Sequence, residues 1–314
     1  MIAAEATVAD DVVAEPRTAR LTEARKGSAA WLRACVELTK PGITRMVVLT
    51  AAAGFYLASR GRIDVLLMLH TLIGTALVAS GAGALNQWVE RAEDGRMKRT
   101  RRRPLPSGRL MPADALAVAL SLSVAGLLQL LVFVNGATAL VVGLSLVSYI
   151  AVYTPLKRRT WIATVIGAVP GALPVLAGWT GAGAPLDVNA WALFAVLFLW
   201  QMPHFYALAW IYRNDYVQGG FRMLTATDPG GSRTSRHIVL FTAALLGVSL
   251  VPYALGRASA AYVWGAVLLG GAFLTLGLAL AVERTDRRAW RLFFGSIIYL
   301  PALLLLLVLT KVPV

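Results

Sequence analysis

Three oxygen-bearing side chains recur at a regular spacing in residues 86–108, NQWVERAEDGRMKRTRRRPLPSG. Asn86, Glu90 and Asp94, which we call the acid row, are each four residues apart. Because a helix has about 3.6 residues per turn, all three would project from nearly one face. Mg²⁺ is typically held by one or two carboxylates together with substrate phosphates and water. We interpret the acid row as a metal site; the alternative is that its acids are only surface partners for the arginines that follow.

A cluster of positive charge follows the acid row directly and comprises Arg96, Lys98, Arg99, Arg101, Arg102 and Arg103. Arginine can bind phosphate oxygens through two parallel N–H groups. We expect Arg99 and Arg103 to bind a diphosphate, with Arg96 and Lys98 as second choices; the other two are more typical of a cytoplasmic membrane surface. The PLPSG sequence at the end predicts a sharp turn, which would fold the cluster back over the acid row.

A second polar site is indicated by residues 197–223, LFLWQMPHFYALAWIYRNDYVQGGFRM. Pro203 lacks an N–H and predicts a kink in an apolar helix, and His204 follows it immediately. A histidine inside a membrane segment is a functional candidate by default, and a hydrogen-bonded structural histidine is the alternative. Asp215 would lie about 16 Å further along the same helix, so we expect it at the level of the acid row.

Membrane helices must position these residues, because the composition excludes a soluble globular protein. The 314-residue chain is 58% hydrophobic and 15% charged, with a mean hydropathy of +0.67, whereas soluble domains carry about 25% charged residues. A membrane helix needs about 20 mostly apolar residues, which predicts an all-α polytopic protein with nine spans. The predicted windows are residues 43–59, 65–88, 113–134, 137–156, 161–180, 189–211, 237–255, 260–282 and 292–311.

The net charge of +14 and the isoelectric point near 10.6 do not indicate nucleic-acid binding, because basic residues of polytopic proteins collect on the cytoplasmic side. If the N-terminus is inside, the Lys and Arg residues that fall outside are Arg60, Arg62, Arg257 and Lys311, out of 30 in the chain. The sequence therefore predicts a cytoplasmic N-terminus, an outer C-terminus and both long polar loops, 89–112 and 212–236, on the cytoplasmic side.

Residues 1–40 carry acids early and no basic region ahead of an apolar core, so they predict a mobile cytoplasmic tail and not a signal peptide. Residues 41–314 are predicted to form one intramembrane domain. Cys35 is the single cysteine, so it has no partner for an intrachain disulfide.

Both motifs together resemble the signatures of the protohaem IX farnesyltransferases, a family also called haem O synthases. Residues 86–108 fit N-Q-x-x-E-x-x-x-D-x-x-M-x-R-T-x-x-R-P-L-P-S-G, and WQMPHFYALAW followed by DYVQGGFRM is similar to the second conserved region. The resemblance extends over roughly residues 35–312. It implies a UbiA-like intramembrane prenyltransferase, with a helical bundle around a central cavity, and identifies residues 41–314 as the prenyltransferase domain.

The resemblance implies that a farnesyl group moves from farnesyl diphosphate to a vinyl group of haem B, with addition of water, to give haem O for terminal oxidases. It also implies Mg²⁺ as the cofactor, held by the acid row with Asp215, and His204 as a contact to haem, through iron or a hydrogen bond. The host membrane would be the bacterial inner membrane or its mitochondrial equivalent. Haem A synthase or oxidase assembly factors are candidate partners.

This chain departs from the wider superfamily at two positions. Glu90 stands where an aspartate is usual, and Gly219 stands where the second motif would carry another acid. The haem branch shares both departures, which favours haem over an aromatic quinone precursor or a chlorin as the acceptor. How the second site would hold Mg²⁺ stays open, as do prenyl length and oligomeric state. A membrane transporter is the non-enzymatic alternative, but the gathering of charge at one face favours chemistry at an interface.

Overall fold

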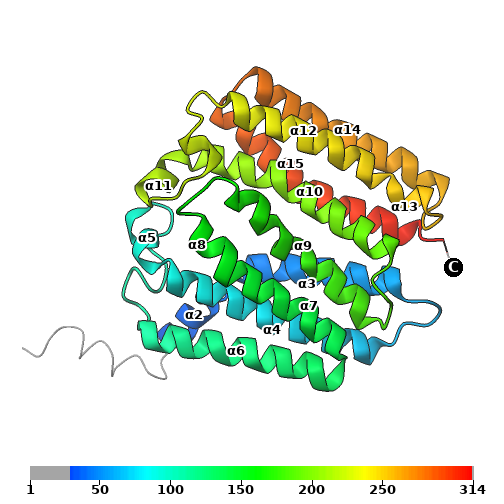
Figure 1. Cartoon of the computed structure of the whole chain (residues 1–314), viewed down its shortest axis with the longest axis horizontal. Coiled ribbons are helices and arrows are strands. Elements are labelled where there is room, and N and C mark those ends of the chain that lie inside the picture. The colour runs from blue at the N-terminus through cyan, green and yellow to red at the C-terminus, as the bar shows by residue number, and fades with distance from the viewer. Residues whose placement is uncertain (1–28, 313–314) are drawn as a thin grey trace, which may run out of the picture.

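The computed structural model describes residues 29–312, and within that range the chain is a bundle of helices (Figure 1). In chain order the helices are α2 (Ala29–Leu38), α3 (Pro41–Ala58), α4 (Val65–Val89), α5 (Arg91–Arg96), α6 (Pro112–Phe133), α7 (Gly136–Val147), the π-helix η1 (Ser148–Tyr153), α8 (Thr154–Leu156), α9 (Ala163–Gly181), α10 (Val188–Ile211), α11 (Arg213–Gln218), the 3₁₀ helix η2 (Leu224–Ala226), α12 (Ser232–Ser249), α13 (Val251–Ala254), α14 (Ala260–Val282) and α15 (Asp286–Leu309).

Nine helical stretches of residues 29–312 are long and apolar enough to cross a membrane, which confirms the predicted number. Helices α7, η1 and α8 together form one of them, Gly136–Leu156, and α12 with α13 forms another, Ser232–Ala254. Most spans begin and end within two residues of the predicted windows. The protein is therefore an all-α integral membrane protein, as the composition indicated.

Two spans begin earlier than predicted, because their first turns are polar and lie outside the apolar windows. Helix α15 begins at Asp286, where the side chain of Thr285 accepts a hydrogen bond from the backbone N–H of Arg288. Helix α12 begins at Ser232, and the buried carboxylate of Asp228 accepts a 2.7 Å hydrogen bond from the backbone N–H of Thr234. Such caps satisfy the first N–H groups of a helix.

The short helix α2 lies where the sequence analysis expected only a tail. Its buried residues, including Ala34 and Leu38, pack with Ala84 of α4 and with Ala115 and Ala119 of α6. The remainder of the expected tail, residues 1–28, lies outside the described residues.

Helix α9 occupies the middle of the bundle, between α10 and α3 in Figure 1. In its apolar window 72% of the residues are buried, against 17% for Gly136–Leu156. Its contact with α3 is made by backbones: a Cβ at Gly54 would collide with the carbonyl oxygen of Val175, and one at Gly178 with that of Ala51. Glycine at a helix interface lets two backbones approach closely. The two backbones thus meet directly at this crossing of α3 and α9.

The short helices divide between the two ends of the bundle. Helices α5, α8 and α11 lie at one end, and α13 lies at the other together with the end of α15 (Figure 1). We call the first the acid-row end, since Asn86 and Glu90 close α4 there, and the second the far end. Both long polar loops therefore lie at the same end, as predicted.

Candidate functional site

The acid row is buried at the end of α4. The exposed fractions of Asn86, Glu90 and Asp94 are 2%, 4% and 1%. Helix α4 ends at Val89, and Glu90 has a non-helical backbone (φ −93, ψ 12), so the prediction of one uninterrupted helix is wrong. The backbone N–H of Glu90 still donates to the oxygen of Asn86 (3.0 Å), and that of Asp94 to the oxygen of Glu90 (2.8 Å). These two backbone hydrogen bonds keep the four-residue spacing of a helix across the junction between α4 and α5.

The loop behind the acid row folds back over it, as the PLPSG turn predicted. Arg103 Nη1 donates to both carboxylate oxygens of Asp94, at 2.7 and 2.9 Å. Thr100 Oγ1 donates to the backbone oxygen of Asp94 at 2.8 Å, which secures the start of the turn. Arg103, which is predicted to bind a diphosphate, is thus held against the acid row.

Two further cations reach the acid row from distant parts of the chain, and sequence reasoning missed both as site residues. Lys157, just after α8, forms an ion pair with Glu90 in which both side chains are about nine-tenths buried or more. Lys40, just before α3, donates to Asn86 Oδ1 at 2.7 Å. Each member of the acid row therefore faces a cation, and the three cations come from three separate segments.

Lys40 is held in an unusual environment. Burial lowers the pKa of Lys40 to about 7, with the positive charge of Arg103 as the next cause. Its backbone has φ +52 and ψ +61, and among residues 29–312 no other non-glycine residue has a positive φ. A non-glycine residue in this region is strained. The Lys40 side chain packs beside Gly83 of α4, where a Cβ would lie 3.5 Å from it, at ordinary van der Waals distance.

The π-helix η1 places two tyrosines beside Lys157. The rings of Tyr149 and Tyr153 are stacked with centroids 5.4 Å apart, and Lys157 Nζ lies 4.7 Å from the centroid of Tyr153. Thr154 Oγ1 accepts a hydrogen bond from Asn86 Nδ2 at 3.3 Å and donates to the backbone oxygen of Tyr149. Short π-helices frequently occur at functional sites. This one gives the acid row an aromatic wall.

Asp215 does meet the loop behind the acid row, but from a separate helix. Helix α10 ends at Ile211, and the non-helical Tyr212 (φ −105, ψ 24) separates it from α11, so the expectation of a single helix through Asp215 is wrong. The Asp215 carboxylate accepts a 3.0 Å hydrogen bond from the backbone N–H of Arg99. The Arg99 guanidinium lies 4.7 Å from the ring centroid of Tyr212. The backbone and the side chain of Arg99 thus connect the loop behind the acid row to Asp215 and Tyr212 of the second site.

A small apolar cluster also joins the two loops. Met97, 2% exposed, packs with Phe221 and Met223. Gly219 lies against it, since a Cβ there would be 3.0 Å from Met97 Sδ. The backbone N–H of Arg222 donates to the carbonyl oxygen of Lys157 at 2.8 Å. The absence of an acid at position 219 therefore has a packing reason: a side chain there would have to displace Met97.

The other predicted cations are less engaged. Arg96, Lys98, Arg101 and Arg102 are exposed. The predicted diphosphate contacts of Arg96 and Lys98 stay predictions. The structure brings Arg103 to the acid row directly and Arg99 to Asp215 through its backbone.

His204 faces α15. Its Nδ1 lies 2.7 Å from Ser296 Oγ, and its ring stacks on those of Trp200 (centroids 5.3 Å apart) and Phe293 (4.8 Å). Among the described residues, Nε2 of His204 has no hydrogen-bond partner. The hydrogen-bonded structural role and the haem role are both compatible with these contacts, so contact with haem stays a prediction.

The donor set fits a divalent metal that arrives with an anionic substrate. Within residues 29–312, no three His, Cys, Asp or Glu side chains are grouped so as to hold a metal by themselves. Two carboxylates and an amide meet at the acid row, all oxygen donors and all nearly buried. Mg²⁺ needs only one or two carboxylates when phosphates and water complete its coordination.

Comparison with known sequences gives consistent matches over most of the chain. The model of the UbiA prenyltransferase family matches residues 47–299. The protoheme IX farnesyltransferase of Solibacter usitatus is 45% identical over 289 residues, covering 89% of this chain and 99% of that protein. The enzyme of the same name from Salinibacter ruber is 43% identical over 270 residues, covering 86% of this chain and 95% of the relative.

Solved structures share the fold at low sequence identity. A structure of digeranylgeranylglyceryl phosphate synthase has a TM-score of 0.74 at 17% identity, covering 89% of this chain and 98% of the other. A UbiA homolog from Archaeoglobus fulgidus bound to GPP and Mg²⁺ has a TM-score of 0.64 at 14% identity, covering 87% and 99% of the two chains.

Proposed function

Since this chain belongs to the UbiA prenyltransferase family, we propose that it transfers a farnesyl group from farnesyl diphosphate to a vinyl group of haem B, with addition of water, to give haem O. The observation that carries the proposal is the buried acid row with its three cations, in a chain that aligns with protoheme IX farnesyltransferases over nearly its whole length. The enzyme works on two amphipathic substrates inside a bilayer.

The chemistry requires a site that accepts a departing anion. The allylic C–O bond breaks with its electron pair on the diphosphate, and the vinyl electrons of haem form the new C–C bond to the farnesyl carbon. Water then adds to the vinyl-derived cation and loses a proton, which leaves a hydroxyl group. Preorganised charges around the leaving group stabilise such a transition state. Mg²⁺, where bound, would neutralise negative charge on the diphosphate as a Lewis acid.

The cations of the site would serve the diphosphate by exchanging partners. Arg103, Lys157 and Lys40 now lie against acid-row oxygens. If the carboxylates of Glu90 and Asp94 and the amide of Asn86 held a metal that accompanies the substrate, these cations would become available to phosphate oxygens. For Arg103 and Lys157 the exchange would keep the buried charges paired, which matters because an unpaired buried charge is costly. Asn86 and Asp215 are the further metal ligands that we propose.

The aromatic wall of Tyr149 and Tyr153 lies beside this position. A cation near the face of an aromatic ring is stabilised by about 0.5–2 kcal/mol. We propose that this wall faces the allylic end of the farnesyl chain and keeps water away from it. His204 is the proposed contact to haem.

The test of the function is chromatography of haems extracted from cells of a host that makes haem B but no haem O. Expression of this chain should produce haem O, and purified protein should require farnesyl diphosphate and Mg²⁺ for the same conversion. An aromatic quinone precursor or a chlorin prenylated in place of haem would support the alternative acceptors. Movement of a substrate across vesicles without any prenylated product would support a transporter.

We propose that the membrane is the inner membrane of a bacterial cell, with the acid-row end on the cytoplasmic side. The support is the distribution of Lys and Arg, which places the cation-rich loops at that end. Reporter fusions at each terminus test it: a cytoplasmic reporter should be active at the N-terminus and inactive at the C-terminus. Direct binding of haem A synthase or an oxidase assembly factor stays a prediction for co-purification.

A further inference from the structure

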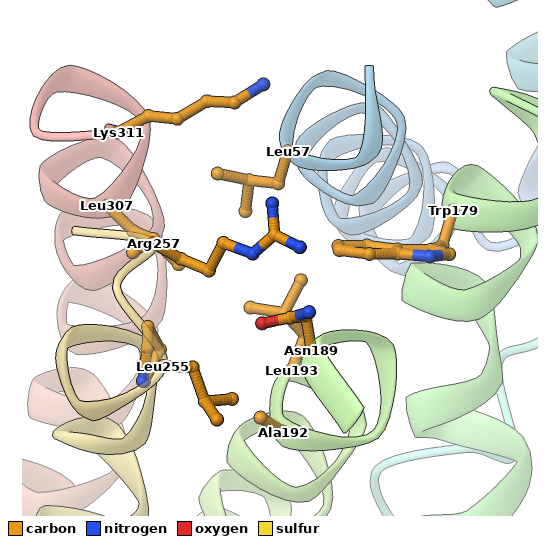
Figure 2. A pocket seen from close by; sticks show the side chains of 10 residues that line it. Leu57, Trp179, Asn189, Ala192, Leu193, Leu255, Arg257, Leu307 and Lys311 are labelled. Atoms are coloured by element: carbon orange, nitrogen blue, oxygen red, sulfur yellow. The ribbon is translucent and has the colours of Figure 1, made fainter. Parts of the chain in front are cut away.

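A pocket opens at the far end of the bundle, away from the chemistry (Figure 2). It is partly open to solvent, and its walls include Leu57, Trp179, Leu193 and Leu307. Leu57 lies near the end of α3, whose first residue follows Lys40. At 1.5 Å per residue the pocket is about 25 Å from the acid row. A ligand bound here would not touch the transfer site.

One cation points into this pocket. Figure 2 shows the guanidinium of Arg257 reaching between Leu57 and Asn189 toward Trp179. Its nearest carboxylate oxygen in the described chain belongs to Asp187 and is 3.9 Å away, which is too long for a hydrogen bond. The Arg257 side chain is only 26% exposed. A largely buried guanidinium with five N–H donors and no hydrogen-bonded anion is a position for a ligand anion.

An acceptor lies beside this cation. Asn189 uses its Nδ2 to donate to Asp187 Oδ2 at 2.8 Å. Its other atom, Oδ1, is buried and has no hydrogen-bond partner among the described residues. A buried carbonyl oxygen without a donor is unfavourable unless a ligand or water supplies one. A ligand that satisfies both groups would therefore carry an anionic group and a hydrogen-bond donor close together.

The backbone around Arg257 is fixed before any ligand arrives. Its N–H donates to the oxygen of Pro252 (2.8 Å), and its own carbonyl accepts from the N–H of Val312 (3.1 Å). The next ladder bond runs from the N–H of Ser259 to the oxygen of Thr310 (2.9 Å). The ammonium of Lys311, by contrast, donates hydrogen bonds to the carbonyl oxygens of Tyr56 and Ser59, at 2.8 and 2.7 Å. Arg257 is thus a positioned cation whose guanidinium lies near a carboxylate without a hydrogen bond to it.

We propose that this pocket binds the headgroup of an anionic lipid that carries a phosphate and a hydroxyl group. The phosphate would accept hydrogen bonds from Arg257, and the hydroxyl would donate to Asn189 Oδ1. The glycerol and the first methylenes would lie against Leu57 and Trp179. The position of the pocket supports a lipid as the source of the phosphate. Its apolar walls and its cation lie together where several spans end. At this level of a membrane protein, Arg and Trp side chains contact lipid headgroups.

Native mass spectrometry of the purified full-length protein with added lipid tests the proposal. Phosphatidylglycerol should be retained by the wild type, and Arg257→Gln should bind it about tenfold more weakly, as expected for loss of a charge-assisted contact. Arg62→Gln is the matched control, because Arg62 is an exposed cation that follows α3 at the same end and does not line the pocket. Equal retention by both variants and the wild type would overturn the proposal.

A second variant tests the acceptor. Asn189→Leu removes the unpartnered oxygen, so the preference of the wild type for phosphatidylglycerol over phosphatidylmethanol, which lacks the hydroxyl donor, should disappear. A wild type with no such preference would refute the assignment of Asn189. Inorganic phosphate should compete poorly with the lipid; competition at equal concentration would show a site for a bare anion and overturn the lipid assignment.

Folding of the variants is checked by elution as a single species and by farnesyl transfer, which should stay near the wild-type rate because Arg257 is remote from the acid row. If Arg257→Gln does not yield folded protein, Arg257→Lys keeps the charge and removes the paired N–H groups. Weaker retention by Arg257→Lys would support the proposal, and unchanged retention would contradict it.

Discussion

The two ends of the bundle treat buried charge in different ways. At the acid-row end, Asp94 accepts two hydrogen bonds from Arg103, and Glu90 is paired with Lys157. At the far end, the guanidinium of Arg257 stays 3.9 Å from Asp187. The first arrangement is complete without a ligand and must be rearranged to bind one, whereas the second is incomplete and can accept one directly. Substitutions that remove a carboxylate should therefore have unequal consequences at the two ends.

The largest effect should come from Asp94→Asn, with Asp187→Asn as the matched change at the far end. The amide keeps the shape of Asp94 but removes the negative charge that pairs with Arg103 and that the proposed metal would need. We expect about a 10³-fold loss of farnesyl transfer, the order seen when one electrostatic contact to a transition state is removed. Haem O formed in purified membranes is the measurement. A similar loss in Asp187→Asn would erase the contrast between the ends.

Glu90→Gln should lower stability as well as activity. It leaves Lys157 buried without its partner, and breaking a buried ion pair from one side costs about 3–5 kcal/mol in the free energy of unfolding. The double variant Glu90→Gln with Lys157→Met should recover most of that stability but not the activity. Thermal unfolding in detergent measures the first, and haem O formation the second. Glu283→Gln, which affects an exposed pair with Arg288, is the control and should change stability little.

Asp215→Asn separates the charge of the second site from its structural contact. The new amide can still accept the hydrogen bond from the backbone N–H of Arg99, so the two loops should stay joined. If Asp215 also serves the metal, farnesyl transfer should fall about 50-fold, a smaller effect than at Asp94 because Asp94 also positions Arg103 through two hydrogen bonds. Unchanged transfer, with an unchanged requirement for Mg²⁺, would reduce Asp215 to a link between loops.

His204→Ala should weaken haem binding about tenfold, since the variant loses the imidazole that we assign to haem. The absorbance of purified protein titrated with haem B measures it. His70→Ala is the matched control, because His70 is also an intramembrane histidine with a polar partner, Gln129, and a stacked ring, Phe133. Equal haem binding by the wild type and both variants would leave His204 with its hydrogen bond to Ser296 alone.

Lys311 should give the smallest effect, confined to the far end. Burial lowers the pKa of Lys311, with the positive charge of Arg257 as the second cause. Between that lowered value and the ordinary value of 10.5, the unfolded chain binds more protons than the folded one, so the free energy of unfolding should rise with pH. Lys311→Met should remove this rise. Thermal unfolding across the alkaline range measures it; equal slopes in both proteins would contradict the assignment.

The sequence was sufficient for the spans, because their hydropathy is high and continuous. It was not sufficient for the breaks at Glu90 and Tyr212, where neither glycine nor proline marks the change and hydrogen bonds of helical spacing continue across both breaks. Helix α2 was missed because it is too short for a membrane window and is stabilised by packing on α4 and α6. Tertiary contacts decide these elements.

The sequence predicted the acid row and Arg103 as site residues but not Lys40 and Lys157, and here too the difference lies in tertiary contacts. The acid row and Arg103 lie close together in sequence, so their spacing carried the information. Lys40 and Lys157 come from distant segments and were interpreted only as charges at a membrane boundary. The available signal was their position within one turn of an apolar window, beside Pro41 in one case and after Tyr153 in the other. Contact with the acid row depends on how the spans pack, which single-sequence patterns do not reveal.

The close helix contacts at Gly54 and Gly178 limit where apolar molecules can enter the interior of the bundle. At this crossing of α3 and α9 backbone lies against backbone, so no side chain can swing aside there to open a passage. A farnesyl chain diffusing in from the lipid therefore has to enter away from this crossing, where the bundle is lined by side chains that can change rotamer.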